Sequence, residues 1–239
     1  ALLLEREGPQ GTTRVLIDTG PDMVPQLLDA GIGAVDAVVY THPHADHIHG
    51  IDDLRQLAYN MDRRIPVHAD AQTSAQLLDR FGYVFHTPEG SSYPPICTLL
   101  PIEGAFAVEG AGGPLRLRPF EVSHGDILAL GFRIAAPAGG LVYLPDVKSI
   151  PDAAWPAIQG AEVFVCDALR PQPHPSHAHL AQALDWIARS GCPRGVLTNM
   201  HIDMDYATVA ATTPDHIQPA FDGMVIEATA DTPDHPAAL

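Results

Sequence analysis

Three histidines and an aspartate occur within six residues of this chain, in the run His42-Pro43-His44-Ala45-Asp46-His47. The run directly follows Ala37–Tyr40, an uninterrupted apolar segment that predicts a buried strand. Residues two apart in an extended chain point to the same side, so His42 and His44 face one way, whereas Asp46 and His47 lie past the turn. Imidazole and carboxylate groups at this spacing are typical metal ligands and suffice for two neighbouring metal ions. The alternative interpretation is a solvated polar loop.

The composition restricts the class of protein that can carry such a site. The chain has 239 residues, of which 46% are hydrophobic, so a packed core is expected and fibrous or disordered classes are excluded. Thirteen Lys and Arg against 29 Asp and Glu give a net charge of −16, which would repel nucleic-acid phosphates and anionic lipids. We therefore expect a small substrate and no long nucleic acid or membrane as partner.

Location and processing are also constrained by the sequence. The most apolar stretch, Ile127–Leu144, contains an arginine, a proline and several glycines and does not predict a membrane span. Three widely separated cysteines predict neither a disulfide framework nor a CxxC zinc site, so a reducing cytoplasm is the expected location. The numbering begins at Ala1 without an initiator methionine, and we expect that upstream residues are missing from it.

The first half of the chain is expected to begin with a hairpin and continue with alternating strands and helices. Strands are predicted at Leu2–Glu5, Val15–Asp18, Ala37–Tyr40 and Ile65–His68. Helices are predicted from Asp22 to Leu28, Ile51–Met61 and Ala71–Phe81. The segment Gly82–Pro95 is expected to be irregular, either as a packed surface loop or as a lid over a pocket.

The second half is expected to contain an antiparallel meander followed by renewed alternation. The predicted strands are Ala105–Val108, Leu115–Val122, Leu128–Ile134, Leu141–Leu144, Val163–Cys166, Gly195–Thr198 and Met224–Glu227. The predicted helices are Pro151–Ile158 and His179–Ser190, the latter with Ser176 as N-cap. We predict one α/β domain over residues 1–239, made of two packed halves that share one plan.

The six-residue run resembles the HxHxDH motif of the metallo-β-lactamase superfamily, and the other motifs of that family follow in order. They are matched by Asp18-Thr19-Gly20, Val122-Ser123-His124-Gly125, Tyr143-Leu144-Pro145-Asp146 and Thr198-Asn199-Met200-His201. The resemblance covers nearly the whole chain. It implies an αββα four-layer sandwich, with Asp18 bracing the loop that carries the ligands.

The resemblance also implies a complete site for two divalent metal ions. His42, His44 and His124 are expected on one ion, Asp46, His47 and His201 on the other, and Asp146 between the two. Without a thiolate, this set suits Zn, Mn or Fe. A hydroxide shared by the metals would be the nucleophile, with Asp46 counted also as a catalytic carboxylate. The bridging aspartate is typical of hydrolases of the superfamily and is missing from true β-lactamases.

A second histidine-containing segment, Pro175–Leu180, indicates which bond is cut. In the phosphodiesterase branch of the superfamily, a histidine upstream of the last ligand protonates the leaving oxygen. His179 lies 22 residues before His201, which resembles the spacing in that branch, and we expect it to be the general acid. His177 is the competing candidate.

The segment Thr41–Arg55 is most similar to the phosphoribosyl cyclic phosphate phosphodiesterases of bacterial phosphonate breakdown. We therefore expect a dinuclear metal-dependent phosphodiesterase acting on a small, cyclic ribose phosphate or a related ester. The alternatives are a thioesterase of the glyoxalase II kind and a non-catalytic metal- or metabolite-binding protein. A homodimer is expected from base rates alone.

Overall fold

The computed structural model describes residues 1–137 and 139–228. The chain divides into two compact units, with the boundary between Arg116 and Leu117. Each unit contains a β-sheet and helices, so the expected mixed α/β class is confirmed. None of the helices in these two ranges has the length and apolarity that a bilayer crossing requires.

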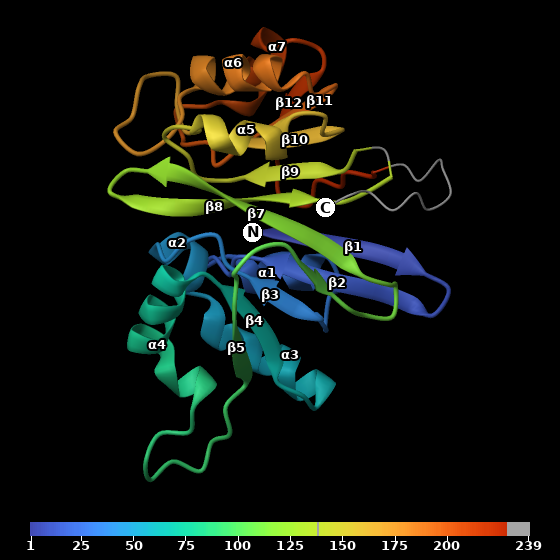
Figure 1. The fold of residues 1–239 in the computed structure, drawn as a ribbon, viewed down its shortest axis with the longest axis vertical. Coiled ribbons are helices and arrows are strands. Elements are labelled where there is room, and N and C mark those ends of the chain that lie inside the picture. Colours follow the sequence, from blue (N-terminus) through green and yellow to red (C-terminus); the bar gives the residue numbers. More distant parts are fainter. Residues whose placement is uncertain (138, 229–239) are drawn as a thin grey trace. The chain divides into compact units, whose positions relative to one another are not determined.

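The first unit is built on a five-stranded sheet in the order β1-β2-β3-β4-β5 (Figure 1). The strands are β1 (Leu2–Gly8), β2 (Gly11–Ile17), β3 (Ala37–Val39), β4 (Ile65–Ala69) and β5 (Cys97–Pro101). The predicted hairpin is confirmed, since β1 and β2 pair antiparallel from Leu2↔Ile17 to Gly8↔Gly11, which leaves a shorter turn than expected. The remaining neighbours pair in parallel. Strand β6 (Phe106–Val108) follows in sequence.

Strand β5 was not expected from the sequence, because its five residues end in a proline and show no clear alternation. Its backbone is nevertheless paired with β4 along its whole length, from Ile65↔Cys97 to Ala69↔Pro101. A proline is tolerated at the last position of an edge strand, where its missing N–H removes no interior hydrogen bond.

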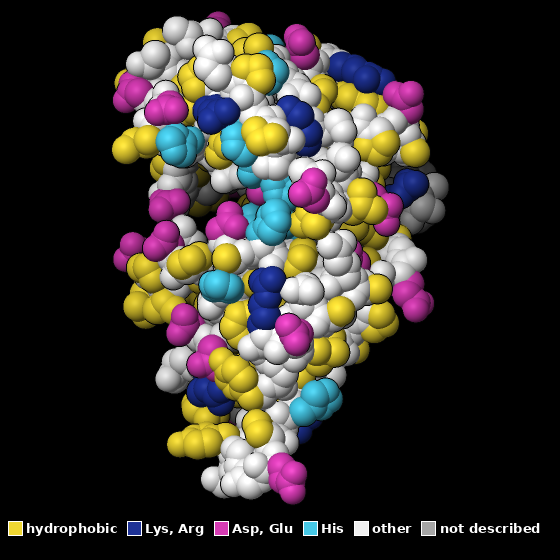
Figure 2. All heavy atoms as spheres, turned by 90° about the vertical axis from the view of Figure 1, so that its left-hand side faces the viewer, with side chains coloured by type: hydrophobic (Ala, Val, Ile, Leu, Met, Phe, Trp, Pro, Cys, Tyr) yellow, Lys and Arg dark blue, Asp and Glu magenta, His cyan; other side chains and the backbone are white. Residues whose placement is uncertain are grey.

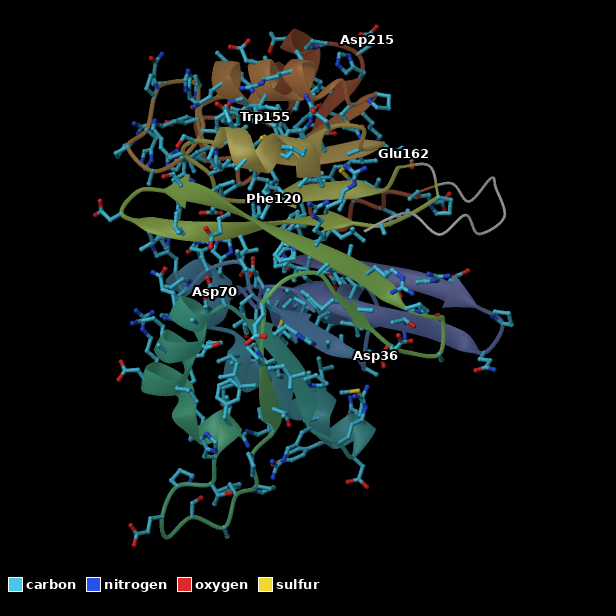
Figure 3. The ribbon with its side chains drawn as sticks, viewed as in Figure 1. Asp36, Asp70, Phe120, Trp155, Glu162 and Asp215 are labelled. Carbon is cyan, nitrogen blue, oxygen red and sulfur yellow. The ribbon has the colours of Figure 1, made fainter. Side chains whose placement is uncertain are left out.

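The helices of the first unit bury apolar side chains against this sheet. They are α1 (Met23–Asp29), α2 (Ala45–Ile48), α3 (Leu54–Met61, after a short 3-10 helix at Ile51–Asp53) and α4 (Ala71–Phe85). Asp70 begins α4 by accepting a 2.7 Å hydrogen bond from the Thr73 N–H (Figure 3). Helix α4 continues past its predicted end through a kink at Phe81, so residues 82–85 are helical and not irregular.

The second unit contains a sheet whose strands run in the order β12-β11-β10-β9-β8-β7. Their bounds are β7 (Leu115–His124), β8 (Ile127–Ile134), β9 (Leu141–Leu144), β10 (Val163–Asp167), β11 (Arg194–Thr198) and β12 (Ile217–Pro219). The expected meander is confirmed, because β7, β8 and β9 pair antiparallel. From β9 to β12 all pairs are parallel, so these four strands end at the same edge of the sheet.

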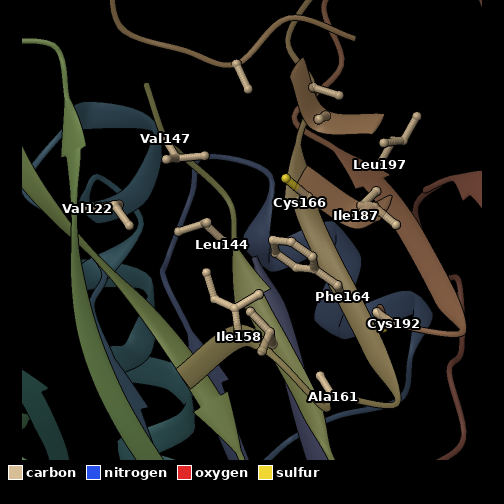
Figure 4. Packing of buried hydrophobic residues seen from close by; sticks show 14 of the residues in the cluster. Val122, Leu144, Val147, Ile158, Ala161, Phe164, Cys166, Ile187, Cys192 and Leu197 are labelled. Carbon is tan, nitrogen blue, oxygen red and sulfur yellow. The ribbon is translucent and has the colours of Figure 1, made fainter. Parts of the chain in front are cut away.

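Three helices and a 3-10 turn are found in the described part of the second unit. They are the turn Asp152–Ala154 and helices α5 (Trp155–Ile158), α6 (Leu180–Ser190) and α7 (Tyr206–Thr212). Phe164 of β10 and Ile187 of α6 lie within the apolar core of this unit, with Leu144 of β9 (Figure 4). Trp155 is 3% exposed, and the Arg189 guanidinium lies 3.9 Å from its ring centroid.

Two predictions for the second unit were wrong. The N-cap residue of α6 is His179 and not Ser176. Residues 224–227 do not form a strand, and β12 is the last strand of the described residues; helix α7 was not expected. Apolar side chains in 224–227 suggested a strand, but Val225 is 78% exposed, whereas Ile217 is 5% exposed and pairs with Gly195. Burial, which a four-residue pattern does not reveal, decided between the two segments.

Candidate functional site

The His42–His47 run connects β3 to α2 in the first unit. His42 is fully buried, and its Nε2 lies 3.1 Å from Nδ1 of His44. His47 is 8% exposed, and its Nε2 lies 3.4 Å from Oδ2 of Asp46. The hydrogen bond from His47 holds the pKa of the Asp46 carboxyl well below its usual range. Three histidines and an aspartate, residue types that can ligate metals, are therefore gathered at one strand end.

Asp18 braces this cluster from the end of β2. Its Oδ1 accepts a hydrogen bond from the Thr41 N–H, and its Oδ2 accepts one from the Thr41 hydroxyl, each at 2.8 Å. Oδ2 also lies 2.8 Å from Nδ1 of His47. With a metal bound, a carboxylate at Nδ1 would keep the proton on that nitrogen and leave the Nε2 lone pair for the ion. Asp18 thus has the bracing role that the resemblance implies.

The backbone of the Asp18 segment approaches helix α2 closely. The Thr19 N–H donates to the His47 carbonyl, and the Gly50 N–H donates to the Thr19 carbonyl, both at 2.7 Å. A Cβ atom at Gly50 would lie 2.7 Å from the Gly20 carbonyl oxygen, so a larger residue would push the two segments apart. The absence of a side chain at Gly50 thus permits the close approach of the Asp18 segment to the helix that carries His47.

A second cluster lies at the edge of the sheet in the second unit. Its side chains come from the last residue of β7, the connection after β9, the last residue of β10, the loop before α6 and the residue after β11. They are His124, Asp146, Asp167, His177 and Asn199. Because β9, β10 and β11 are parallel, their carboxyl ends bring residues far apart in sequence to one edge.

The contact between His124 and Asp146 fits a bound cation. Nδ1 of His124 lies 2.8 Å from the Ser176 carbonyl oxygen, which is an acceptor, so Nδ1 must carry the proton. Nε2 of His124, with its lone pair, then faces Oδ2 of Asp146 at 3.3 Å, and both side chains are buried. Two acceptors at this distance require a proton or a metal ion between them. Together with His177, these residues offer ligand atoms that all lie within 4.8 Å.

His177 is held by Asp167. Its Nδ1 lies 3.0 Å from Oδ2 of Asp167 and 3.7 Å from Oδ2 of Asp146. Oδ2 of Asp167 also accepts hydrogen bonds from the N–H groups of Val147 and Ala178. Burial raises the pKa of Asp167 to about 6, against the hydrogen bond from His177, which lowers it. The carboxylate of Asp167 thus orients the ring and favours a proton on Nδ1.

In the described part of the chain, no contact joins the His179 side chain to this cluster. His179 is the N-cap residue of helix α6, and its backbone forms an isolated parallel β-bridge with Arg170. Its Nδ1 is buried and has no hydrogen-bond partner in the part of the chain that the structure describes. Of the two candidate general acids, the structure brings His177 to Asp146 and Asp167.

His201 lies apart from the cluster as well. Its side chain is 54% exposed, and its Nδ1 lies 3.4 Å from Oδ2 of Asp203. Asn199, two residues earlier, is the side chain that reaches Asp146, and its Nδ2 donates to Oδ1 of Asp146 at 3.2 Å.

Asp167 and Asn199 were not singled out from the sequence. The signal that could have identified them is their position, because each stands at the end of a buried strand in the same way as Asp146. A histidine attracts attention wherever it occurs, whereas an aspartate or asparagine at a strand end is common. Only the pairing of β9, β10 and β11 shows that these ends share an edge.

The basic residues near the motifs are engaged with protein groups. Lys148 donates to the His174 carbonyl, and Arg170 donates to the carbonyls of Gln172 and Pro173. Arg55 pairs with Asp52 and lines a hollow of about 380 Å³ in the first unit with Tyr83, Pro88, Ser91 and Tyr93. On the face seen in Figure 2, Lys and Arg lie in separate small groups and not in a continuous basic patch.

Comparison with known proteins agrees with this geometry. Residues 13–202 match the family described as beta-lactamase superfamily domain. A crystal structure described as a new diphosphatase from the PhnP family is 32% identical, with a TM-score of 0.80 over 91% of this chain and 81% of that chain. The short form of human tRNase Z has a TM-score of 0.64 over 94% of this chain and 97% of its own, but 16% identity, and so shares the fold alone.

Among curated relatives, the octanoyltransferase of Porphyromonas gingivalis is 32% identical over 215 residues, or 88% of this chain. The match covers 42% of the length of that protein. The chain spans less than half of the length of the curated relatives it matches. The family resemblance inferred from the sequence is thereby confirmed, together with the fold of the metal-dependent hydrolases in this family.

Proposed function

We propose that this chain, which belongs to the beta-lactamase superfamily, is a metal-dependent phosphodiesterase acting on a small phosphate ester. The observation that carries the proposal is the Asp167–His177 pair, which lies directly beside the metal-ligating groups of His124 and Asp146. A thioester needs little help from a proton donor, because a thiolate leaves readily. A phosphodiester with an alkoxide leaving group gains much more from an oriented acid.

The proposed metal ligands are those on which the resemblance and the local geometry agree. They are His42, His44, Asp46, His47, His124 and Asp146. The donor set of imidazoles and carboxylates fits Zn or Mn, with Fe also compatible. Two divalent ions, when bound, would supply an activated water and neutralise the charge that develops on the phosphoryl oxygens.

The remaining chemistry belongs to His177. Protonated at Nε2, it donates this proton to the leaving oxygen as the P–O bond breaks. Asp167 keeps Nδ1 protonated and the ring in place, and it stabilises the imidazolium before the transfer. Asp167 thus acts through His177 as a positioning residue. We assign the general-acid role to His177 and not to His179, because Nδ1 of His177 is the one bonded to a buried carboxylate.

The substrate is proposed to be small. The charge of −16 opposes binding to a long polyanion, and the PhnP-family relative is described as a diphosphatase. A cyclic ribose phosphate or a related ester satisfies these conditions.

The test is hydrolysis of an aryl phosphodiester and of a thioester by protein that is stripped of metal and then reconstituted with Mn²⁺ or Zn²⁺. We expect metal-dependent turnover of the phosphodiester, and loss of turnover in Asp146→Ala. Hydrolysis of the thioester alone would indicate a thioesterase. Protein that binds metal but hydrolyses neither compound would indicate a binding protein, and both outcomes would contradict the proposal.

A further inference from the structure

Two side chains follow strand β11 closely enough to serve the metal site, Asn199 and His201. If Asn199 reaches the site, the ligand is a side-chain amide; if His201 does, it is an imidazole. The question rests on the proposed function, because it presumes that a metal is bound at the His124–Asp146 cluster.

The backbone of Asn199 directs its side chain to this cluster. Its φ is 57°, in the left-handed region that residues other than glycine seldom adopt. Such strain is retained mainly where the surroundings enforce it, and it is frequent at functional sites. The amide nitrogen lies 3.2 Å from Oδ1 of Asp146 and 3.5 Å from Nδ1 of His177.

The first unit contains the same arrangement at Asp18. That residue also directly follows a strand, has a φ of 63°, and directs its side chain to a metal-ligating histidine, His47. In both units, therefore, a left-handed Asp or Asn at a strand end contacts the histidine–carboxylate cluster. The parallel indicates that the conformation of Asn199 serves the site and is not an accident of the turn.

His201 makes different contacts from Asn199. Its N–H donates to the Leu169 carbonyl at 2.7 Å, and its carbonyl accepts from the Met204 N–H at 2.8 Å. Its ring lies beside Asp203 and is more than half exposed. The contact given for the His201 ring is therefore with Asp203, whereas the Asn199 amide is the group that bonds to Asp146.

We propose that Asn199, and not His201, is the residue of this strand end that serves the metal site. A side-chain amide can present its NH₂ group or, after rotation by half a turn, its carbonyl oxygen at nearly the same place. With a cation bound beside Asp146, the amide oxygen of Asn199 could serve as a ligand in place of the NH₂ group that now faces the carboxylate. A neutral oxygen is a weaker ligand for Zn²⁺ than an imidazole and suits Mn²⁺ better. One of the two metal ions is consequently held loosely and exchanges easily.

Metal content tests this assignment without reference to activity. The protein is equilibrated with Zn²⁺ buffered by a chelator, and bound zinc per chain is measured by mass spectrometry. The variants are Asn199→His, Asn199→Gly and His201→Ala, with His216→Ala as control for loss of an exposed histidine in the same unit. Glycine keeps the left-handed backbone, and histidine is among the residues that tolerate it. Circular dichroism confirms that each variant is folded.

We expect Asn199→His to tighten the weaker zinc ion by about tenfold or more and Asn199→Gly to weaken it by a similar factor. His201→Ala and His216→Ala should leave both ions in place. If His201→Ala loses zinc while Asn199→Gly retains it, the assignment is overturned and the proposed function stands. If the unmodified protein binds no metal ion at all, the proposed function fails first, and this assignment with it.

Discussion

At the scale of single residues, the chemistry depends on buried acids that hold histidines in one orientation. Asp18 contacts His47 in the first unit, and Asp167 contacts His177 in the second, each through Nδ1 of the imidazole. In each case the acid also accepts a backbone N–H, from Thr41 or from Val147. The acid is thereby fixed to the backbone, so the ring that it orients is fixed as well.

The role of His177 as proton donor predicts a dependence on the leaving group. His177→Gln should lower kcat for a phosphodiester with an alkyl leaving group by about 10²- to 10⁴-fold, because the departing alkoxide must be protonated. The loss should be much smaller for a nitrophenyl ester, whose leaving group is stable as an anion. Steady-state kinetics on the two esters, with zinc content measured in parallel, check this expectation.

His179→Gln is the matched control for that experiment, since His179 lies two residues away and outside the cluster. It should change neither ester's kcat by more than a few-fold. The reverse pattern, with the leaving-group dependence appearing in the His179 variant, would show that the general acid is the residue favoured by spacing alone.

At the scale of elements, the ends of strands and helices are secured by side chains that are distant in sequence. Arg133 of β8 is the main example. Its guanidinium donates to the carbonyls of Ala157, Ile158 and Gln159, at the end of α5, and to those of Gly139 and Gly160. The last carbonyls of a helix have no partner within the helix, and here the arginine satisfies them.

Arg133→Lys should therefore destabilise the protein, because an ammonium group has three donors and lacks the planar fork. We expect a loss of about 1.5–3 kcal/mol in the free energy of unfolding, as for hydrogen bonds to a charged group. Chemical denaturation monitored by circular dichroism measures it. Arg118, which lies opposite Arg133 on β7 and is exposed, provides the control. An equal loss in Arg118→Lys would refute the specific role of Arg133.

Helix α7 should lose its N-terminal cap in acid. Asp205 accepts hydrogen bonds from the N–H and hydroxyl of Thr208, which lower its pKa below the ordinary value of 3.8. A lowered pKa means that the ionised form is favoured in the folded state. Its contribution is present above pH 3.8 and is lost as the pH falls through the folded-state value.

Hydrogen exchange at the Thr208 amide checks this prediction, after correction for the intrinsic rate at each pH. Protection should fall below pH 4 in the unmodified protein. In Asp205→Asn the protection should not respond to pH in this window, because the amide does not titrate. A persistent acid response in that variant would locate the titrating group elsewhere.

At the scale of the whole molecule, each unit has its own buried core, and the three cysteines lie within them. Cys97 belongs to the core of the first unit, and Cys166 and Cys192 belong to that of the second. Their exposed fractions are 1%, 0% and 5%. Burial raises the pKa of the Cys97 thiol to about 12 and that of Cys166 well above its usual value.

All three thiols should consequently resist alkylation in the native protein at pH 8–9. The thiolate is the reactive form, and burial both suppresses it and blocks access of the reagent. Iodoacetamide labelling followed by mass spectrometry should show modification only at denaturant concentrations that unfold the unit in question. Rapid labelling of Cys97 in native buffer would mean that the core of the first unit opens without unfolding.

The sequence by itself determined the family, the hairpin, the meander and the histidine cluster of the first unit. Each depends on residues close together in the chain, where alternation and ligand spacing can be recognised directly. The residues that complete the cluster of the second unit were decided only by the tertiary structure. The resemblance already names His124 and Asp146, whereas Asp167 and Asn199 were not singled out from the sequence. Parallel pairing of β9, β10 and β11 brings the strand ends that carry Asp146, Asp167 and Asn199 to one edge.

The choices between neighbouring candidates were likewise decided by the tertiary structure. His177 and His179 differ by two residues, as do Asn199 and His201, and spacing does not separate them. The hydrogen bond to Asp167 selects His177, and the left-handed backbone after β11 directs Asn199 to Asp146. A linear motif records which residue types are present, whereas backbone dihedral angles and strand pairing determine which of them meet.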